Sequence, residues 1–466
     1  MCASLITQSG QQGMAVKSPR TIAEAGRALR SGLWTCEGLT RFYLEGIRKL
    51  NPVLHVMITV CEDAALEQAA ILDRELQEGV DRGPLHGIPI VNKDLFAARG
   101  LPMTVGSPIF RNAVQAQDSA VIERLRRHGC ILLGQSNLGE FAAVPVGRNR
   151  TYGDVYNPWQ QDHTPGASSS GSAAALAAGL CLASTGSDTG GSVRTPASCC
   201  GVMGIRPTSN LISLEGSFPR SLSLDAAGVL AHSAEDMGFL LAALLDTPER
   251  AAEVRSPASI RLATIADFTY SDVDEVVATS VRQALEKVAA AGGEIVEQRS
   301  SLLSHELPTD ELFTLLTYEF SKIMESLYAS NPKELFDPCV HDDMRRGRSI
   351  TDAQYQQAMV QRKRYQEQIG SLFEAADILV TPTIPTRVPH YDSPASIWSR
   401  QKRFLIPVSY LGLPALSLPC GLDDEGLPIG LQLIGRPYSE FRLLQAARFL
   451  EECGVVPAAR PSANWS

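Results

Sequence analysis

Glycine and hydroxyl residues gather at positions 186–194, which read GSDTGGSVR. Glycine lets a backbone turn tightly and bring its N–H groups close to another group. The N–H groups of Thr189, Gly190 and Gly191 can form a nest for a developing oxyanion, with Ser192 beside them as a nucleophile. The alternatives are a phosphate loop and a simple tight turn. Because neither GxxxxGK nor GxGxxG occurs in the chain, nucleotide binding has little support.

A lysine follows the apolar segment GIPIVN, which begins at Gly87 and predicts a buried strand. Lysine is scarce in this chain, with eight among 42 Lys and Arg residues, so Lys93 stands out. Burial at a strand end would lower the pKa of the Lys93 amine toward the neutral form, which can act as a general base. The alternative is a lysine that reaches solvent and pairs with Asp94.

A serine-rich turn opens an alanine-rich stretch that begins at Thr164 and reads TPGASSSGSAAALAAGL. Taken alone, this turn is typical of an N-cap cluster at the start of a helix, because Ser and Thr cap helices well. The apolar stretch from Ala173 to Ala183 is too short to span a bilayer and predicts a packed core helix.

The three segments together resemble the signature of the amidase signature family of serine hydrolases. The segments that carry the resemblance follow in the family's order and spacing: GPLHGIPIVNKD, PGASSSGSAAALAAGL and GSDTGGSVRTPASCCGVMGIRPT. The similarity extends over most of the chain, through GCILLGQSNLGEFA, DILVTPTIPTRVP, GLPALSLPCG and GLPIGLQLIGRP.

The resemblance implies a Ser-cisSer-Lys triad, with Ser192 as the nucleophile, Ser168 as the bridging serine and Lys93 as the base. The oxyanion hole would consist of the loop N–H groups named above. The cis peptide bond would join Ala167 to Ser168, because the chain has Gly-Ala-Ser-Ser-Ser-Gly-Ser where the family commonly has Gly-Gly-Ser-Ser-Gly-Gly-Ser.

Charged residues flank the glycine loop on both sides. From their charge and position we expect Asp188 and Arg194 to hold the loop in shape rather than to touch the substrate.

The expected function is therefore hydrolysis of a small-molecule carboxamide, to a carboxylic acid and ammonia or an amine, through an acyl-serine intermediate. No cofactor is required, and a homodimer is compatible with such an enzyme. One alternative is one chain of a glutamine-dependent amidotransferase that works with a partner on charged tRNA. Those chains usually carry an EVKRRI-like segment, where this one reads DDMRRGRSITDAQYQQAM.

A second alternative is an α/β-hydrolase esterase with a Ser-His-Asp triad. Residues 167–171 are a near miss of GxSxG centred on Ser169, and His232 or His341 would be its histidine. This alternative has two weaknesses. Ala167 stands where the GxSxG motif has its first glycine, and a Ser-His-Asp triad gives Lys93 no role, whereas the Ser-cisSer-Lys triad makes it the base.

Composition restricts the partners and the compartment. The net charge of -9 gives no basic field for nucleic acid, and the N-terminus has no signal-like apolar segment for secretion or membrane insertion. Ten cysteines without a disulfide framework predict reduced core thiols in a cytoplasmic protein. No metal is expected, because the nearest cluster, around Cys339 and His341, lacks ligand spacing.

Alternating helical and strand patterns predict one α/β domain over residues 1–466, with a large mixed, mostly buried sheet and helices on both faces. A helical segment is expected at about 15–80, before the first strand, and the signature core at about 83–215. Further patterns predict the following elements: helices at 119–128, 274–291, 352–374 and 440–451, and strands at 130–134, 294–297, from 377, at ALSLP and at IGLQLIG.

The substrate pocket is expected to be formed by segments outside the signature. The candidates are residues 141–150, the region near Tyr318 and Phe320, and residues 382–398, whose Tyr391 and Trp398 could line an apolar pocket.

Overall fold

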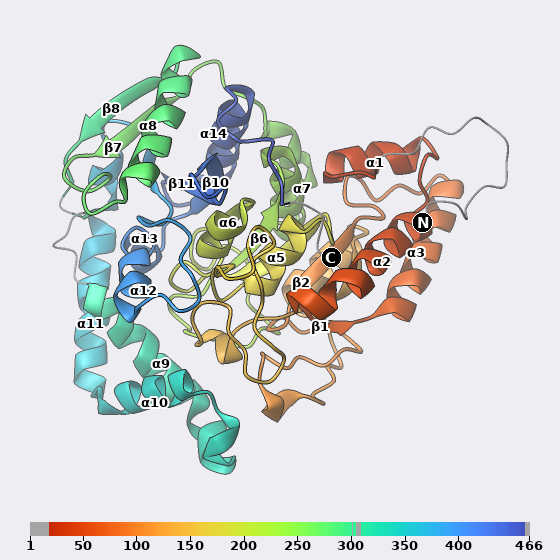
Figure 1. Cartoon of the computed structure of the whole chain (residues 1–466), viewed down its shortest axis with the longest axis horizontal. Helices are drawn as coiled ribbons and strands as arrows, with labels where there is room; N and C mark the ends of the chain where they lie inside the picture. The colour runs from red at the N-terminus through yellow and green to blue at the C-terminus, as the bar shows by residue number, and fades with distance from the viewer. Residues whose placement is uncertain (1–17, 301, 304–308, 462–466) are drawn as a thin grey trace.

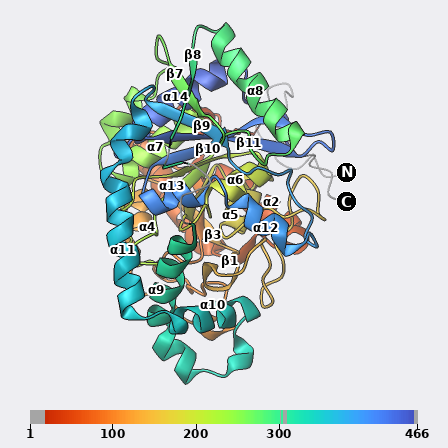
Figure 2. The same ribbon diagram turned by 90° about the vertical axis from the view of Figure 1, so that its left-hand side faces the viewer.

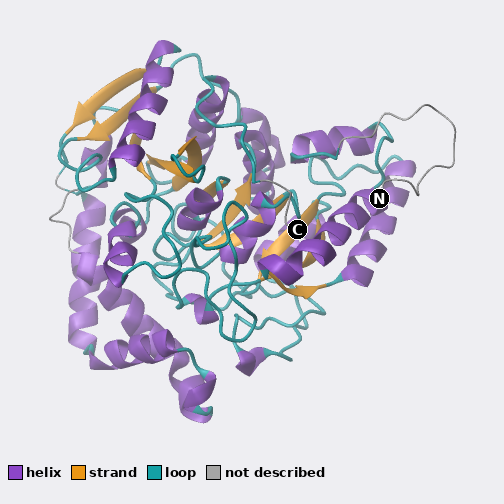
Figure 3. Cartoon of the chain, viewed as in Figure 1, coloured by secondary structure: helices purple, strands orange, loops and turns teal. Residues whose placement is uncertain are grey.

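The computed structural model describes residues 18–300, 302–303 and 309–461 of the chain (Figure 1). Residues 1–17, on which the expectation about the N-terminus rests, lie outside the described residues. Strands run through the middle of the molecule and helices surround them (Figure 3).

The strands of the described part form one sheet of eleven, in the order β1-β3-β2-β4-β6-β5-β10-β11-β9-β7-β8. Their bounds are β1 (Met57–Val60), β2 (Pro89–Lys93), β3 (Ile131–Ser136), β4 (Ala183–Ser187), β5 (Met203–Arg206), β6 (Ala227–Ala231), β7 (Arg261–Ile265), β8 (Glu294–Gln298), β9 (Ile378–Pro382), β10 (Ala415–Leu422) and β11 (Pro428–Gly435).

The α-helices of the same part are α1 (Ile22–Arg30), α2 (Cys36–Leu54), α3 (Glu62–Gln77), α4 (Ala120–Arg127), α5 (Ser170–Ala177), α6 (Arg194–Cys200), α7 (Ala234–Leu244), α8 (Glu275–Ala290), α9 (Thr309–Ser330), α10 (Pro338–Ser349), α11 (Asp352–Glu367), α12 (Ala395–Gln401), α13 (Ile406–Leu411) and α14 (Glu440–Glu452). Short 3-10 turns are η1 (Pro108–Phe110), η2 (Glu140–Ala142), η3 (Pro248–Glu253), η4 (Lys333–Leu335) and η5 (Ile369–Phe373).

The sheet is mixed. Strand β2 runs parallel to both of its neighbours, β3 and β4, and β7 runs parallel to β8 and β9. The strands between these two groups pair antiparallel, from β4 through β6, β5, β10 and β11 to β9.

The inner strands are buried because both of their faces are covered. Every residue of β2, β3, β4, β5 and β6 is buried, whereas β1 and β8, at the two ends of the sheet, are partly exposed. Continuous apolar runs are typical of strands buried on both sides. Helices α8 and α14 lie on one side of β9, β10 and β11, and α12 and α13 lie on the other (Figure 2).

Side-chain caps set where several helices begin. The hydroxyls of Thr21, Thr35, Ser119 and Ser233 accept hydrogen bonds from the first turns of α1, α2, α4 and α7. Thr351 and Gln354 form a reciprocal capping box at the start of α11. Such caps satisfy backbone N–H groups that have no partner within the helix.

The predicted mixed sheet with flanking helices is confirmed, and four details of the expected elements are wrong. The core helix predicted from Ala173 to Ala183 is shorter, because α5 ends at Ala177 and Ala183 begins β4. Strand β1 lies between α2 and α3, so the segment expected to be helical at about 15–80 contains a strand. Helix α11 ends at Glu367, and η5 follows it, so the long helix at 352–374 is shorter than expected. Helices α9 and α10 were not predicted from the sequence. Yet Leu312, Leu315, Leu316 and Phe320 of α9 are buried at helical spacing, a signal that could have revealed it.

No helix among the described residues has both the length and the apolar character needed to cross a membrane. The cysteines of this part are all free thiols, and the adjacent Cys199 and Cys200 are both buried.

Candidate active site

The site forms where two neighbouring parallel strands end at the same edge of the sheet. Strand β2 ends at Lys93 and β4 ends at Ser187, with Val91 opposite Ser184 in the register. The Lys93 N–H also donates to Thr185 Oγ1 at 2.9 Å, which fixes the end of β2 against β4. The carboxyl ends of parallel strands are where α/β folds commonly place their ligands.

Lys93 is fully buried and surrounded by hydroxyl groups. Its Nζ lies 2.8 Å from Ser168 Oγ, 2.9 Å from Ser169 Oγ and 2.8 Å from Ser187 Oγ. Burial lowers the pKa of Lys93 to about 7, against the opposing effect of the carboxylates of Asp225 and Asp188. A large share of the amine is therefore neutral near pH 7.

The alternative for Lys93, a solvent-exposed lysine paired with its neighbour, is wrong. Lys93 has no solvent exposure, and the Asp94 carboxylate accepts instead from the N–H and hydroxyl of Thr104. Burial raises the pKa of Asp94 to about 7, against the hydrogen bonds from Thr104.

Ser168 and Ser169 come from the turn before α5. The peptide bond between Ala167 and Ser168 is cis, as the resemblance implied. The Ser169 N–H donates to the carbonyl oxygen of Ser192 at 3.2 Å, so this turn is joined to the glycine loop.

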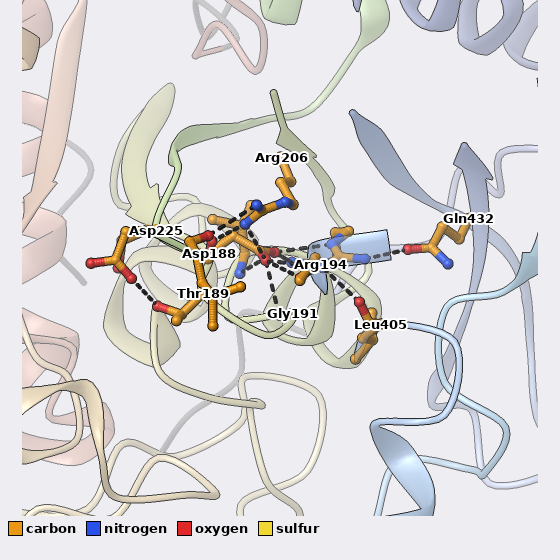
Figure 4. A network of polar contacts seen from close by, with 12 residues as sticks. Asp188, Thr189, Gly191, Arg194, Arg206, Asp225, Leu405 and Gln432 are labelled. Carbon is orange, nitrogen blue, oxygen red and sulfur yellow. Dashed lines mark hydrogen bonds and ion pairs between the residues drawn. The ribbon is translucent and has the colours of Figure 1, made fainter. Parts of the chain in front are cut away.

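An ion pair holds the loop from Asp188 to Ser192 (Figure 4). Arg194 Nε and Nη2 donate to the two carboxylate oxygens of Asp188 at 3.0 and 2.9 Å, and both side chains are fully buried. The same carboxylate accepts from the N–H groups of Gly191 and Val193 at 2.9 and 3.2 Å. Asp188 and Arg194 thus have the contacts expected of residues that shape the loop.

Further partners complete this buried centre. Arg194 Nη1 donates to Gln432 Oε1 at 2.7 Å, and Arg206 donates to the carbonyl oxygen of Asp188. Burial alone would raise the pKa of Asp188, but the guanidinium groups of Arg194 and Arg206 hold it well below its usual range. Asp188 therefore remains ionised, which the buried arginines require.

The loop N–H groups differ in availability. Those of Thr189, Gly190 and Ser192 have no acceptor among the described residues, whereas the Gly191 N–H donates to Asp188. Gly191 is therefore not a free donor, contrary to the expectation for it. It has a φ of +112°, and a Cβ there would lie 2.9 Å from Leu405 Cβ, so the turn itself requires glycine.

A cavity of about 940 Å³ opens onto the site. Its lining includes Ser168, Thr189, Gly190 and Ser192, and Ser192 is partly exposed to it. Lys93 lies behind Ser168, away from the solvent. The structure thus brings the predicted base, bridging serine and nucleophile to one place.

Only some of the expected pocket segments line this cavity. Residues 142–146 and Trp398 do so. Tyr318 and Phe320 do not: Tyr318 stacks on Tyr355, and Phe320 is buried. Tyr391 lines a separate hollow.

Three site residues were not identified from the sequence. Ser169 and Ser187 contact Lys93 directly, and Asp225 accepts from Thr189 Oγ1 at 2.6 Å. The serine at the end of β4 could have been found from its place beside Lys93 on the neighbouring strand. Asp225 had no such signal, because its loop is distant in sequence.

No histidine among the described residues lines the cavity, which leaves the esterase alternative without its base. His232 is half-buried outside the cavity lining, and burial of its ring lowers its pKa to about 3. His341 bonds the hydroxyl of Tyr328 at 2.6 Å.

One group of residues in the described part has the composition of a metal site. The ligand atoms of Asp162, His163 and His390 lie within 4.8 Å of one another, outside the lining of the cavity. His163 Nδ1 is already bonded to Asp162 Oδ1 at 2.8 Å. This cluster therefore lies apart from Ser192 and the cavity that it lines.

The family described as Amidase matches residues 38–444. The chain belongs to the amidase signature family. As an amidase signature enzyme, it acts at an amide C–N bond, as a hydrolase or as an amidotransferase.

Relatives of this amidase signature enzyme match over nearly their whole lengths. It is 34% identical to a glutamyl-tRNA(Gln) amidotransferase subunit of Methylobacillus flagellatus, over 89% of the chain and 93% of the relative. It is 33% identical to the corresponding subunit of Prochlorococcus marinus, over 95% and 99%.

Solved amidase structures share the fold. One described as an amidase is 30% identical, with a TM-score of 0.85 over 93% of this chain and 99% of the other. The peptide amidase of Stenotrophomonas maltophilia is 26% identical, with a TM-score of 0.82 over 95% and 98%.

Proposed function

We propose that this enzyme cleaves a carboxamide with Ser192 as the nucleophile, Ser168 as the relay and Lys93 as the base. One observation carries the proposal: the buried Lys93 Nζ, whose pKa is lowered to about 7, lies 2.8 Å from Ser168 Oγ, which shares a cavity with Ser192. A serine hydroxyl is a poor nucleophile until a neighbouring base takes its proton, and a neutral amine can take it.

The hydroxyl groups around Lys93 suit an uncharged amine, which has two N–H donors and one lone pair. Ser169 Oγ donates to the carbonyl oxygen of Ser187 at 3.4 Å, so it accepts from Lys93. Among the described residues, Ser168 Oγ has Lys93 as its one hydrogen-bond partner. The lone pair is therefore open to a proton from Ser168.

In the proposed reaction, Ser192 Oγ attacks the amide carbon while its proton passes through Ser168 to Lys93. The C–N bond then breaks, and ammonia or an amine leaves with that proton. Water hydrolyses the acyl-serine and restores the Ser192 hydroxyl, without a cofactor. The N–H groups of Thr189, Gly190 and Ser192 are the proposed donors to the oxyanion, each worth about 3 kcal/mol.

The test compares wild-type protein with Ser192→Ala on a panel of primary amides, anilides and carboxylated ureas. We expect the wild type to release ammonia or amine and a fluorophosphonate reagent to label Ser192, as detected by peptide mass spectrometry. The variant should show neither. Unchanged amide turnover in Ser192→Ala would contradict the proposal.

The curated relatives favour a more specific second candidate, the ammonia-producing component of a glutamine-dependent amidotransferase. Their agreement with this chain over nearly full length supports it more directly than it supports free-standing hydrolysis. The candidate requires glutamine as the amide and a protein partner as the consumer of ammonia.

The second candidate is tested by purification from the cells that make the protein, followed by a glutaminase assay. A stable complex with glutamine-dependent ammonia release supports the amidotransferase. A lone chain that hydrolyses other amides and leaves glutamine intact supports the hydrolase.

We also propose that residues 1–466 form one domain and that the protein is cytoplasmic. We further propose that it binds no nucleic acid and forms a homodimer. Analytical ultracentrifugation of the full chain tests the dimer.

A further inference from the structure

The cavity at Ser192 has a charged lining as well as a nucleophile. Its charged side chains come from loops and helices distant in sequence: Arg220, Asp272, Asp310, Asp343, Arg346, Arg400, Lys402 and Arg403. Arg400 pairs with Asp272 and Asp274. We name Arg220, Arg346 and Lys402 the basic cluster. The two arginines lie close enough to Lys402 for their positive charges to lower its pKa.

Arg220 has an unused donor that is buried at the cavity wall. Its side chain pairs with Asp343 through Nη2, and its guanidinium carbon lies 3.9 Å from the centre of the Phe320 ring. The residue is 7% exposed, and its Nη1 has no hydrogen-bond partner. Buried guanidinium nitrogens are normally bonded, so Nη1 lacks an acceptor that a ligand could supply.

Lys402 offers a second cation without a carboxylate partner among the described residues. It follows α12, and its Nζ lies 4.9 Å from the centre of the Phe313 ring, which also lines the cavity. Lys402 is exposed overall, but the packing around its amine and the positive charges of Arg220 and Arg346 lower its pKa, against the nearby Asp343 carboxylate. A bound anion would act against this shift and stabilise the ammonium form.

The backbone connects the basic cluster to the reacting centre. The N–H groups of Arg220 and Ser221 donate to Asp225 Oδ2 at 2.8 and 3.0 Å. Asp225 Oδ1 in turn accepts from Thr189 Oγ1, in the loop of Ser192. Arg220 is therefore held near the loop that would bind the scissile amide.

We propose that Arg220 and Lys402 bind a carboxylate of the substrate, so that the preferred substrates are amides carrying a second, anionic group. The proposal rests on amide cleavage at Ser192. A carboxylate has two oxygens, one for Arg220 Nη1 and one for Lys402 Nζ. The requirement also applies to the second candidate function, because glutamine carries a carboxylate.

The carboxylate can belong to the acyl part or to the leaving amine, and a binding experiment separates the two sources. Calorimetry with Ser192→Ala protein measures binding of dicarboxylic acid monoamides of increasing chain length, glutamine and N-acyl amino acids. Each is compared with a neutral amide of the same length and with an ω-ammonium amide. Because the protein lacks the nucleophile, binding is measured whether or not Ser192 is catalytic.

We expect at least one carboxylated series to bind about tenfold or more tightly than its neutral counterpart. Adding Lys402→Met should remove most of that preference, and adding Lys402→Glu should reverse it in favour of the ammonium amide. Lys363→Met is the matched control, because Lys363 is exposed on α11 outside the cavity lining, and it should leave the preference intact. The double variants retain Arg220 and Asp343, so the ion pair between these two residues stays intact and the variants should fold.

Equal binding of carboxylated and neutral amides, or no binding of any carboxylated amide, would overturn the proposal. A preference that survives Lys402→Glu would also overturn it. Loss of amide turnover on Ser192→Ala tests the proposed function separately.

Discussion

Asp188 and Arg194 form a fully buried ion pair in which two nitrogens of the guanidinium meet both carboxylate oxygens, at 3.0 and 2.9 Å. The carboxylate also accepts from the N–H groups of the glycine loop, so one pair determines both the local charge and the loop conformation. Such a centre is costly to break, because each removed partner leaves an uncompensated charge in the protein interior.

Replacement of Arg194 by Met should therefore lower the free energy of unfolding by about 3–5 kcal/mol. Chemical denaturation monitored by circular dichroism measures this. Arg299→Met is the matched control: its pair with Asp267 is exposed, at 85% and 80%, and its loss should cost less than about 1 kcal/mol. A similar effect of the two variants would argue against a structural role for Arg194.

Removal of the two hydroxyls nearest Lys93 should have unequal effects. Ser168 and Ser187 both lie 2.8 Å from Nζ, but only Ser168 lines the cavity with Ser192. We expect Ser168→Ala to lower kcat by about 10²–10⁴-fold, as for loss of a proton-transfer group, and Ser187→Ala to lower it much less. Steady-state kinetics on one amide measures kcat for both variants. Equal losses of kcat would mean that Ser168 is not the relay.

The pH dependence should follow Lys93. Its pKa is lowered to about 7, and only the neutral amine accepts a proton, so kcat/KM should rise with pH and level off above about 7. Below that value the amine is protonated, and the rate should fall about tenfold per pH unit. Lys93→Arg should be inactive across the range, because a guanidinium stays charged. A wild-type profile that is flat through pH 7 would exclude Lys93 as the base.

Two adjacent glycines should tolerate alanine differently. Gly191 has a φ of +112° and would place a Cβ against Leu405, whereas a Cβ at Gly190 would meet only Ile406 Cδ1, at 3.5 Å. Gly191→Ala should therefore lower the free energy of unfolding by about 1–3 kcal/mol. Gly190→Ala should leave thermal stability close to the wild type. The same melting temperature for both variants would contradict this account.

Local sequence patterns predicted β2, α4 and β3 early in the chain and α8, β8, β9, β10, β11 and α14 late in it, because apolar runs and caps act between near neighbours. They did not predict β1, α7, α9 or α10, nor β4, α6 and β5 within the signature core. The polar α10, which begins at Pro338, has little apolar periodicity to reveal it. Whether Gly191 offers a free N–H was also beyond sequence reasoning, since that depends on where the Asp188 carboxylate points.

The sequence by itself determined which residues are available for chemistry: a scarce lysine after an apolar strand, a serine-rich turn and a glycine loop in the order of the amidase signature family. Only the tertiary structure decided that Lys93 is fully buried among three hydroxyls, and that Arg220 and Lys402 share the cavity of Ser192. The reason is physical: desolvation and charge pairing depend on groups that folding brings from distant segments, and these interactions set the protonation state of an amine and the binding preference of a cavity.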